Sequence, residues 1–274
     1  MSIPITWVDA FSDVAFGGNP AAVCLLNDGV SNDNDQALDD VRMQSIASEL
    51  GLAETAFVTR TEDPAVFGLR WFTPTVEADI CGHATLAAAH ALRESGVVDG
   101  AVPLTFLTRS GPLGAAFEGD MVSLDFPADP MTPCALPDSL KRQWPTADVV
   151  ETGRSRYDWF VVLSSADLVR AYEPELAAVA AAGDRGLLLT AVGDPGTGAD
   201  YVLRVFAPNV GIPEDPATGS AQCTAGPYWS GVLGLDTLVA RQMSSRGAVL
   251  RVQVDRERVK IAGHATTVLT GHLC

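Results

Sequence analysis

The chain has few positively charged residues. It contains 18 Lys and Arg against 34 Asp and Glu in 274 residues, which gives a formal net charge of −16. A protein that binds nucleic acid needs a basic face to neutralise phosphates. We therefore expect no nucleic-acid partner, and an anionic ligand would have to be held by local N–H groups against an unfavourable overall field.

Long apolar runs and paired cysteines are also lacking. No apolar run reaches the roughly 18 residues of a membrane-spanning helix, and the N-terminus lacks the pattern of a signal peptide. The five cysteines are odd in number, scattered and never spaced as C-x-x-C: Cys24, Cys81, Cys134, Cys223 and Cys274. This pattern predicts reduced thiols in a cytoplasmic protein that has no membrane partner.

No metal-ligand spacing is evident either. The four histidines, His83, His90, His264 and His272, do not recur with acids or thiols at the intervals typical of metal sites. The sequence therefore predicts no metal site.

A repeat of about half the chain length is present instead. Arg204-Val-Phe-Ala-Pro-Asn-Val210 matches Arg70-Trp-Phe-Thr-Pro-Thr-Val76, with Arg, Phe, Pro and Val at the same four spacings. Downstream, Gly219-Ser220-Ala221 stands where Gly82-His83-Ala84 stands in the first copy, and the second copy has three extra residues before it. A repeat this long predicts a duplicated α/β domain. We place the halves at residues 1–127 and 128–274, with the last strand able to pack back on the first half and the proline-rich segment 127–145 as linker.

The stretch Gly211 to Ala221 is the richest in candidate functional groups. It combines two acids, two prolines, two glycines and two hydroxyls between a predicted strand (201–207) and a segment that can start a helix (222–229). N–H groups at a helix start bind anions, and glycine allows a ligand to approach the main chain. The alternative is an Asx turn in which Ser220 or Thr218 only caps the helix.

Glu54 is the second candidate. If a strand begins at Leu52, its alternation puts Glu54 on one face with Leu52, Ala56 and Val58. A carboxylate on an apolar face suits proton transfer. The alternative is that Glu54 lies at the exposed start of the strand, since Glu is seldom fully buried.

Three further segments have patterns that predict helices. Met43, Ile46, Ala47 and Leu50 form an apolar stripe that Gly51 can end. Residues 84–92 are apolar almost all round, which predicts a helix enclosed by other elements. Residues 166–182 read as a helix with a break at Pro174.

Five segments in order resemble signatures of the phenazine-biosynthesis PhzF-like isomerase family. They are Gly18-Asn19-Pro20-Ala21-Ala22-Val23, Met43-Gln44 with Glu54-Thr55-Ala56-Phe57-Val58, Cys81-Gly82-His83-Ala84-Thr85, the stretch Gly211 to Ala221, and Arg241-Gln242-Met243-Ser244-Ser245-Arg246-Gly247. Any one of these motifs is weak, but the resemblance runs over nearly the whole chain.

The resemblance implies a diaminopimelate-epimerase-like α/β (α+β) fold with two similar halves, each a curled sheet around a central helix, and a site in the cleft between them. It implies a cofactor-independent isomerase that moves a proton on a small carboxylate-bearing substrate. The family's acid/base glutamate falls on Glu54, its histidine on His83 and its aspartate on Asp215, which could orient His83 or a substrate amine. Substrate binding falls on Asn19, Gly82, Thr218, Gly219 and Ser220. Members are commonly homodimers, so a homodimer is implied.

Two departures bear on the substrate. Ala53 replaces a serine that often precedes the glutamate, and Gln222-Cys223 stands where many relatives of uncertain substrate carry His-Cys. The reaction class is therefore implied more strongly than the substrate.

Two other function classes stay open. A two-thiol racemase would use one cysteine from each half, and Cys81 stands at the first junction, whereas Cys223 lies past the start of the second helix. A thiol there acts only as a low-pKa thiolate. A non-catalytic small-ligand binding protein is the other, although a mere binder has no need of a desolvated acid at position 54.

Overall fold

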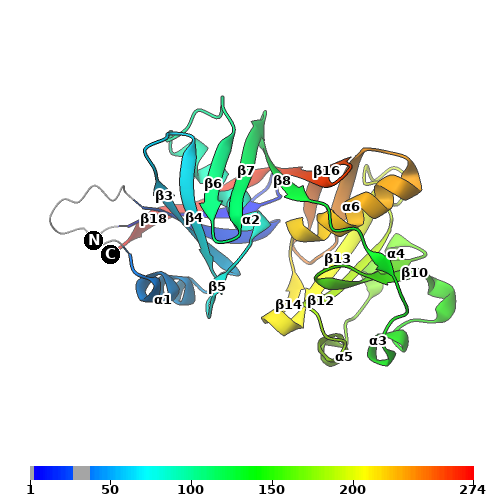
Figure 1. The fold of residues 1–274 in the computed structure, drawn as a ribbon. Coiled ribbons are helices and arrows are strands. Elements are labelled where there is room, and N and C mark those ends of the chain that lie inside the picture. Colours follow the sequence, from blue (N-terminus) through cyan, green and yellow to red (C-terminus); the bar gives the residue numbers. More distant parts are fainter. Residues whose placement is uncertain (1–2, 27–37) are drawn as a thin grey trace. The chain divides into compact units, whose positions relative to one another are not determined.

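The computed structural model describes residues 3–26 and 38–274. The chain forms two compact units (Figure 1). Unit 1 comprises Met1–Asp125 and Ala262–Cys274, and unit 2 comprises Phe126–Ile261. Among the described residues, no helix has both the length and the apolar character needed to cross a membrane.

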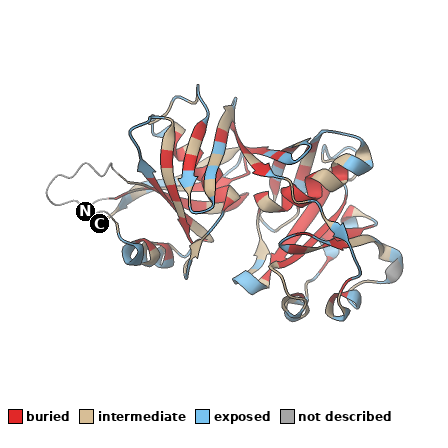
Figure 2. Cartoon of the chain, in the orientation of Figure 1, coloured by how far each residue is buried: buried red, intermediate tan, exposed pale blue. Residues whose placement is uncertain are grey.

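Unit 1 is a mostly antiparallel sheet curled around helix α2. Its helices are α1 (Asp40–Leu50) and α2 (Gly82–Glu94). Its strands are β1 (Ile3–Ala10), β2 (Asn19–Leu26), β3 (Glu54–Arg60), β4 (Val66–Phe72), β5 (Glu77–Ala78), β6 (Leu104–Thr108), β7 (Gly111–Glu118), β8 (Met121–Pro127) and β18 (Ala265–Leu273). The sheet runs β18–β1–β2–β3–β4–β6–β7–β8, and among its described strands β2–β3 and β4–β6 are the parallel pairs. Helix α2 packs against β1, β2, β3 and β18, and its alanines are buried. Figure 2 colours the chain by burial, with buried residues in red.

Unit 2 repeats this scheme around helix α6. Its helices are α3 (Asp138–Lys141), α4 (Ala166–Ala171), α5 (Leu176–Ala181), α6 (Gly219–Leu233) and the 3₁₀ turns η1 (Thr146–Asp148) and η2 (Pro208–Val210). Its strands are β9 (Thr132–Pro133), β10 (Val149–Arg154), β11 (Asp158–Leu163), β12 (Gly186–Val192), β13 (Tyr201–Ala207), β14 (Ile212–Asp215), β15 (Thr237–Gln242), β16 (Ala248–Asp255) and β17 (Arg258–Gly263). Strand pairs β11–β12 and β13–β15 are parallel, while β10–β11, β12–β13, β13–β14 and β15–β16 are antiparallel.

The pairing of β10 to β16 reproduces that of β1 to β7, which confirms that the sequence repeat reflects a repeated fold. The repeated arginine has the same partner type in both units. Arg70 of β4 binds Glu77 of β5 through two hydrogen bonds of 2.7 and 2.8 Å. Arg204 of β13 binds Glu214 of β14 at 2.7 and 3.0 Å. Each guanidinium also lies over the phenylalanine two residues later, Phe72 or Phe206. In each unit, the arginine of the motif thus binds the short strand (β5 or β14) that precedes the central helix (α2 or α6).

Strand β14 was not expected from the sequence, since it lies within the Gly211–Ala221 stretch. Pro213 lacks an N–H and disfavours a strand interior. The strand forms because Ile212 and Asp215 pair with Ala207 and Val205, a register that leaves Pro213 outside the regular ladder. The helix that follows starts at Gly219 and continues to Leu233 through an internal Pro227, so it is longer than the expected segment 222–229.

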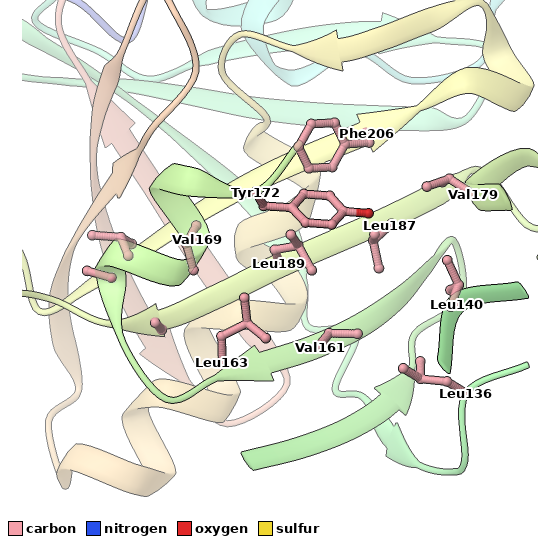
Figure 3. Close-up of a cluster of buried hydrophobic side chains, with 13 residues drawn as sticks. Leu136, Leu140, Val161, Leu163, Val169, Tyr172, Val179, Leu187, Leu189 and Phe206 are labelled. Atoms are coloured by element: carbon pink, nitrogen blue, oxygen red, sulfur yellow. The ribbon is translucent and has the colours of Figure 1, made fainter. Parts of the chain in front are cut away.

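The proline-rich segment 127–145 is not simply a linker. Leu136 and Leu140 are buried in a hydrophobic cluster of unit 2 together with Val161, Tyr172 and Phe206 (Figure 3). Two leucines among the prolines supply enough apolar surface to pack. The break at Pro174 is confirmed, since α4 ends at Ala171 and α5 begins at Leu176. Gly51 ends α1 in the left-handed conformation, φ 64°, as expected.

Candidate functional site

Glu54 is the first residue of β3, and Leu52 lies outside the strand. The prediction that the strand alternation begins at Leu52 is therefore wrong. Leu52 instead packs with Phe57 in the hydrophobic cluster next to α1. Glu54 is at the start of the strand, yet its side chain is only 12% exposed. Burial at a strand start comes from its position beside Ala21 of the parallel strand β2 and near the start of α2.

His83 lies next to Glu54. It is the second residue of α2, and its side chain is 8% exposed. His83 Nε2 lies 3.2 Å from Glu54 Oε2. Oε2 is buried and accepts no well-aligned hydrogen bond from the described residues, so we treat the approach as a charge contact. The histidine is a partner of the carboxylate and not only a residue of the first helical turn.

Cys81 and Asn19 complete the cluster in unit 1. Cys81 precedes α2 as its N-cap residue, and its Sγ lies 3.5 Å from His83 Nδ1 and 4.0 Å from Nε2. Asn19, the buried first residue of β2, has its Nδ2 3.2 Å from His83 Nδ1. An amide N–H donated to Nδ1 leaves the imidazole proton on Nε2, directed at the side of Glu54.

Burial and the charge of Glu54 set the protonation of this cluster. Burial, and secondarily the charge of Glu54, raise the pKa of the Cys81 thiol. Burial alone would lower the pKa of His83, but Cys81 and Glu54 together raise it well above the ordinary value. Because the thiol itself is held neutral, we assign the raising effect mainly to Glu54. An imidazolium would need Asn19 to turn its amide oxygen toward Nδ1.

The spacing of residues in the sequence did not show that this cluster could hold a metal ion. Ligand atoms of Glu54, Cys81 and His83 all lie within 4.8 Å of one another, close enough for one metal ion. The prediction of no metal-ligand set relied on spacing within short segments, which cannot show that Glu54 of β3 lies next to Cys81. The signal that could have found it is the Cys-x-His pair at a helix start.

In unit 2, Asp215 and Thr218 form one network with Gln242. The Thr218 hydroxyl donates to Asp215 Oδ2 at 2.6 Å. Gln242, at the end of β15, accepts from the Thr218 N–H at 2.7 Å and donates to the Asp215 carbonyl at 2.6 Å. Ser244 donates to the Pro216 carbonyl at 2.8 Å. The late Gln-x-Ser motif therefore fixes the loop before α6. Thr218 is the N-cap residue, but its side chain bonds Asp215 and no N–H of the helix.

Ser220 is joined to a pair that sequence reasoning missed. It is the second residue of α6, and its Oγ accepts a hydrogen bond of 2.9 Å from Arg185 Nη1. Arg185 is held by Asp158 through Nε at 2.9 Å and through Nη2, and the side chain of Asp158 is 3% exposed. Since Ser220 accepts from Arg185, its own hydroxyl hydrogen is available to a ligand. No signal in the sequence links these three residues.

Equivalent positions in the two units carry different chemistry. Gly82 and Gly219 both open their helices, and His83 corresponds to Ser220. Thr55 pairs with Phe72 and Leu187 pairs with Phe206, so the position of Glu54 in β3 corresponds to Gly186 in β12. A Cβ at Gly186 would lie 1.8 Å from the Phe206 carbonyl oxygen, so no side chain fits. At these two equivalent positions, the carboxylate (Glu54) and the imidazole (His83) are present in unit 1 alone.

Comparison with known proteins agrees with the motifs. A family profile described as phenazine biosynthesis-like protein matches residues 8–271. An uncharacterized isomerase of Halalkalibacterium halodurans is 40% identical over 100% of this chain and 99% of its own. The mouse phenazine biosynthesis-like domain-containing protein 2 is also 40% identical, with the same coverage.

Solved structures share the fold. A PhzF-family protein of Enterococcus faecalis superposes with a TM-score of 0.90 at 36% identity, covering 100% of both chains. A probable proline racemase of Agrobacterium radiobacter, 13% identical, covers 99% of this chain and 93% of its own with a TM-score of 0.60, a likeness of fold alone. The mixed α/β fold expected from the motifs is confirmed, and the chain belongs to the phenazine biosynthesis-like PhzF family.

Proposed function

We propose that this protein is a cofactor-independent isomerase in which Glu54 removes a proton from a small carboxylate-bearing substrate and returns it to another atom. Relatives named isomerases support the reaction class. One observation carries the assignment of the acid. Glu54 is a largely buried carboxylate whose Oε2 has a histidine 3.2 Å away as its neighbour at the start of an enclosed helix.

His83 is proposed to hold the Glu54 carboxylate in position through the contact of 3.2 Å between Nε2 and Oε2. Asn19 orients the ring through Nδ1. Gly82 leaves the main chain at the start of α2 open to the substrate.

Gly219 and Ser220, at the start of α6, are proposed to bind the substrate carboxylate. Ser220 has its hydroxyl hydrogen available, and the Arg185 guanidinium supplies positive charge beside it. Asp215 and Thr218 form one hydrogen-bonded unit that would bind a donor such as a substrate amine. That one ligand is held by the junctions of both units stays a prediction, as does the homodimer.

The two-thiol racemase is less well supported. The N-cap position of α6 that corresponds to Cys81 is Thr218, which has no thiol. Cys223 lies within α6, and burial raises its pKa to about 12. A thiol in that state does not act as a base near neutral pH.

Proton exchange tests the proposal without knowledge of the product. A thermal-shift screen of small carboxylic acids first finds a ligand, and NMR in D₂O then follows loss of its C–H signal. Glu54→Gln should slow exchange by at least about 10²-fold and change ligand affinity by less than about tenfold. Glu49→Gln, which removes an exposed acid of α1, is the control. Equal exchange by wild type and Glu54→Gln on a verified ligand would exclude Glu54 as the acid/base.

A further inference from the structure

We propose that Glu54, Cys81 and His83 form a binding site for Zn²⁺, and that the bound ion inhibits the isomerase by occupying Glu54. The inhibitory part depends on the proposed function, whereas the binding part does not. The site lies entirely within unit 1.

The distances suit a small tetrahedral ion. Bonds of about 2.0–2.3 Å place the ligand atoms of a tetrahedral Zn²⁺ site about 3.3–3.8 Å apart. His83 Nε2 lies 3.2 Å from Glu54 Oε2 and 4.0 Å from Cys81 Sγ, and the whole set spans at most 4.8 Å. Side-chain movements of about 1 Å would bring all three onto one ion.

The donor types select the metal. A thiolate and an imidazole favour Zn²⁺, while Mg²⁺ and Ca²⁺ prefer oxygen ligands alone. Three protein ligands leave a fourth position for water, as in open zinc sites. Binding releases the Cys81 thiol proton to solvent, the proton on His83 Nε2 moves to Nδ1 or, from an imidazolium, to solvent, and no electron is transferred.

The surroundings of the cluster also favour an ion. Glu54 Oε2 is buried without a well-aligned hydrogen bond from the described residues, so its full acceptor capacity is not used. Cys81 is the N-cap residue of α2, so its side chain stands at the N-terminal end of a helix, where the helix dipole favours a negative charge. Asn19 lies 3.2 Å from His83 Nδ1 and, with its amide oxygen turned to the ring, would hold the histidine as an outer partner.

The arrangement has a second reading, in which the three groups interact only with one another and with substrate. The readings differ in what happens when metal is added to chelator-treated protein. Co²⁺ replaces Zn²⁺ in such sites, and a Co²⁺–thiolate bond produces a charge-transfer band that neither imidazole nor carboxylate gives.

The experiment titrates the full chain with Co²⁺ and then displaces it with Zn²⁺. We expect one thiolate charge-transfer band at one ion per chain. Cys81→Ser and Cys81→Ala should both lose the band, and His83→Gln and Glu54→Gln should weaken binding. Asn19→Ala should weaken it by about 10–100-fold, the usual effect of an outer-shell partner. Circular dichroism of each variant checks the fold.

Matched controls lie in the same unit. Cys24 is a buried thiol of β2, and His90 is a partly buried histidine of α2 bonded to Thr267, so Cys24→Ser and His90→Gln should keep the band. Absence of a band in wild-type protein, or its persistence in both Cys81 variants, would overturn the site. A band without inhibition of proton exchange by Zn²⁺ would refute the inhibitory part alone. If wild-type protein shows no exchange on any ligand, the proposed function fails while the Co²⁺ result still decides the site.

Discussion

Replacing Arg204 by Met should destabilise unit 2 strongly. The side chains of Arg204 and Glu214 are 11% and 25% exposed, and they share two hydrogen bonds. Arg204 Nη1 also donates to the Tyr172 carbonyl at 2.6 Å. Removing one partner of a buried ion pair leaves a buried charge without compensation and costs about 3–5 kcal/mol. We expect a loss at the lower end, about 3 kcal/mol, because Glu214 retains some contact with water.

The equivalent change in unit 1 is the internal comparison. Arg70 is 33% exposed, and its partner Glu77 also accepts a hydrogen bond of 2.9 Å from Arg109. Glu77 therefore keeps a cation when Arg70 is removed. We expect Arg70→Met to cost about 1.5 kcal/mol, the lower end of the range for losing a hydrogen bond to a charged group.

Urea unfolding followed by tryptophan fluorescence measures both changes. Three of the five tryptophans, Trp144, Trp159 and Trp229, belong to unit 2 and report on it. The double variant Arg204→Met/Glu214→Gln should lose less stability than the sum of its single changes, because no charge is then left without a partner. Equal losses for Arg70→Met and Arg204→Met, or strictly additive losses in the double variant, would refute the reasoning.

Three further changes test other parts of the structure. At about pH 8, only the two exposed thiols, Cys134 and Cys274, should react quickly with a thiol reagent. Burial raises the pKa of the other three thiols, Cys24, Cys81 and Cys223. A third thiol that reacts quickly before denaturation would contradict this. Gly186→Ala should lower the urea midpoint or prevent folding, because the new Cβ meets the sheet, whereas Gly231→Ala in α6 has open space and should be neutral or stabilising. Cys81→Ser should keep most proton exchange, and its complete loss in a folded variant would revive the two-thiol racemase.

Much of the fold followed from the sequence because the repeat marks equivalent structure. The repeated Arg-x-Phe motif forms the same Arg–Glu pair in both units. The three extra residues of the second copy fall between Arg204 and Glu214, which are ten positions apart, whereas Arg70 and Glu77 are seven apart. Strand β14 was missed because Pro213 argues against a strand, while long-range pairing with β13 decides the outcome. Tertiary contacts here outweigh local preference.

The site was less predictable, because its contacts join distant segments. The motifs gave Glu54, His83 and Asn19, and the structure brings these three together from β3, α2 and β2. They could not give the Asp158–Arg185–Ser220 set, whose members are widely separated in the sequence and share no motif. Nor does the sequence show that Gly186 takes the place of Glu54 in unit 2, since that equivalence depends on strand register.

This difference between the units bears on stereochemistry. A racemase inverts a centre by removing a proton on one face and adding one on the other, which requires two acid/base groups. In the described structure, Glu54 and His83 have Gly186 and Ser220 as their counterparts, and neither of these exchanges a proton near neutral pH. Unit 2 instead has Arg185 beside Ser220, with its guanidinium paired to the buried Asp158. One carboxylate that removes and returns a proton acts from one side only. The proposed reaction is thus a shift of a proton along one face of the substrate, because the positions equivalent to Glu54 and His83 supply no second base for inversion of a single centre.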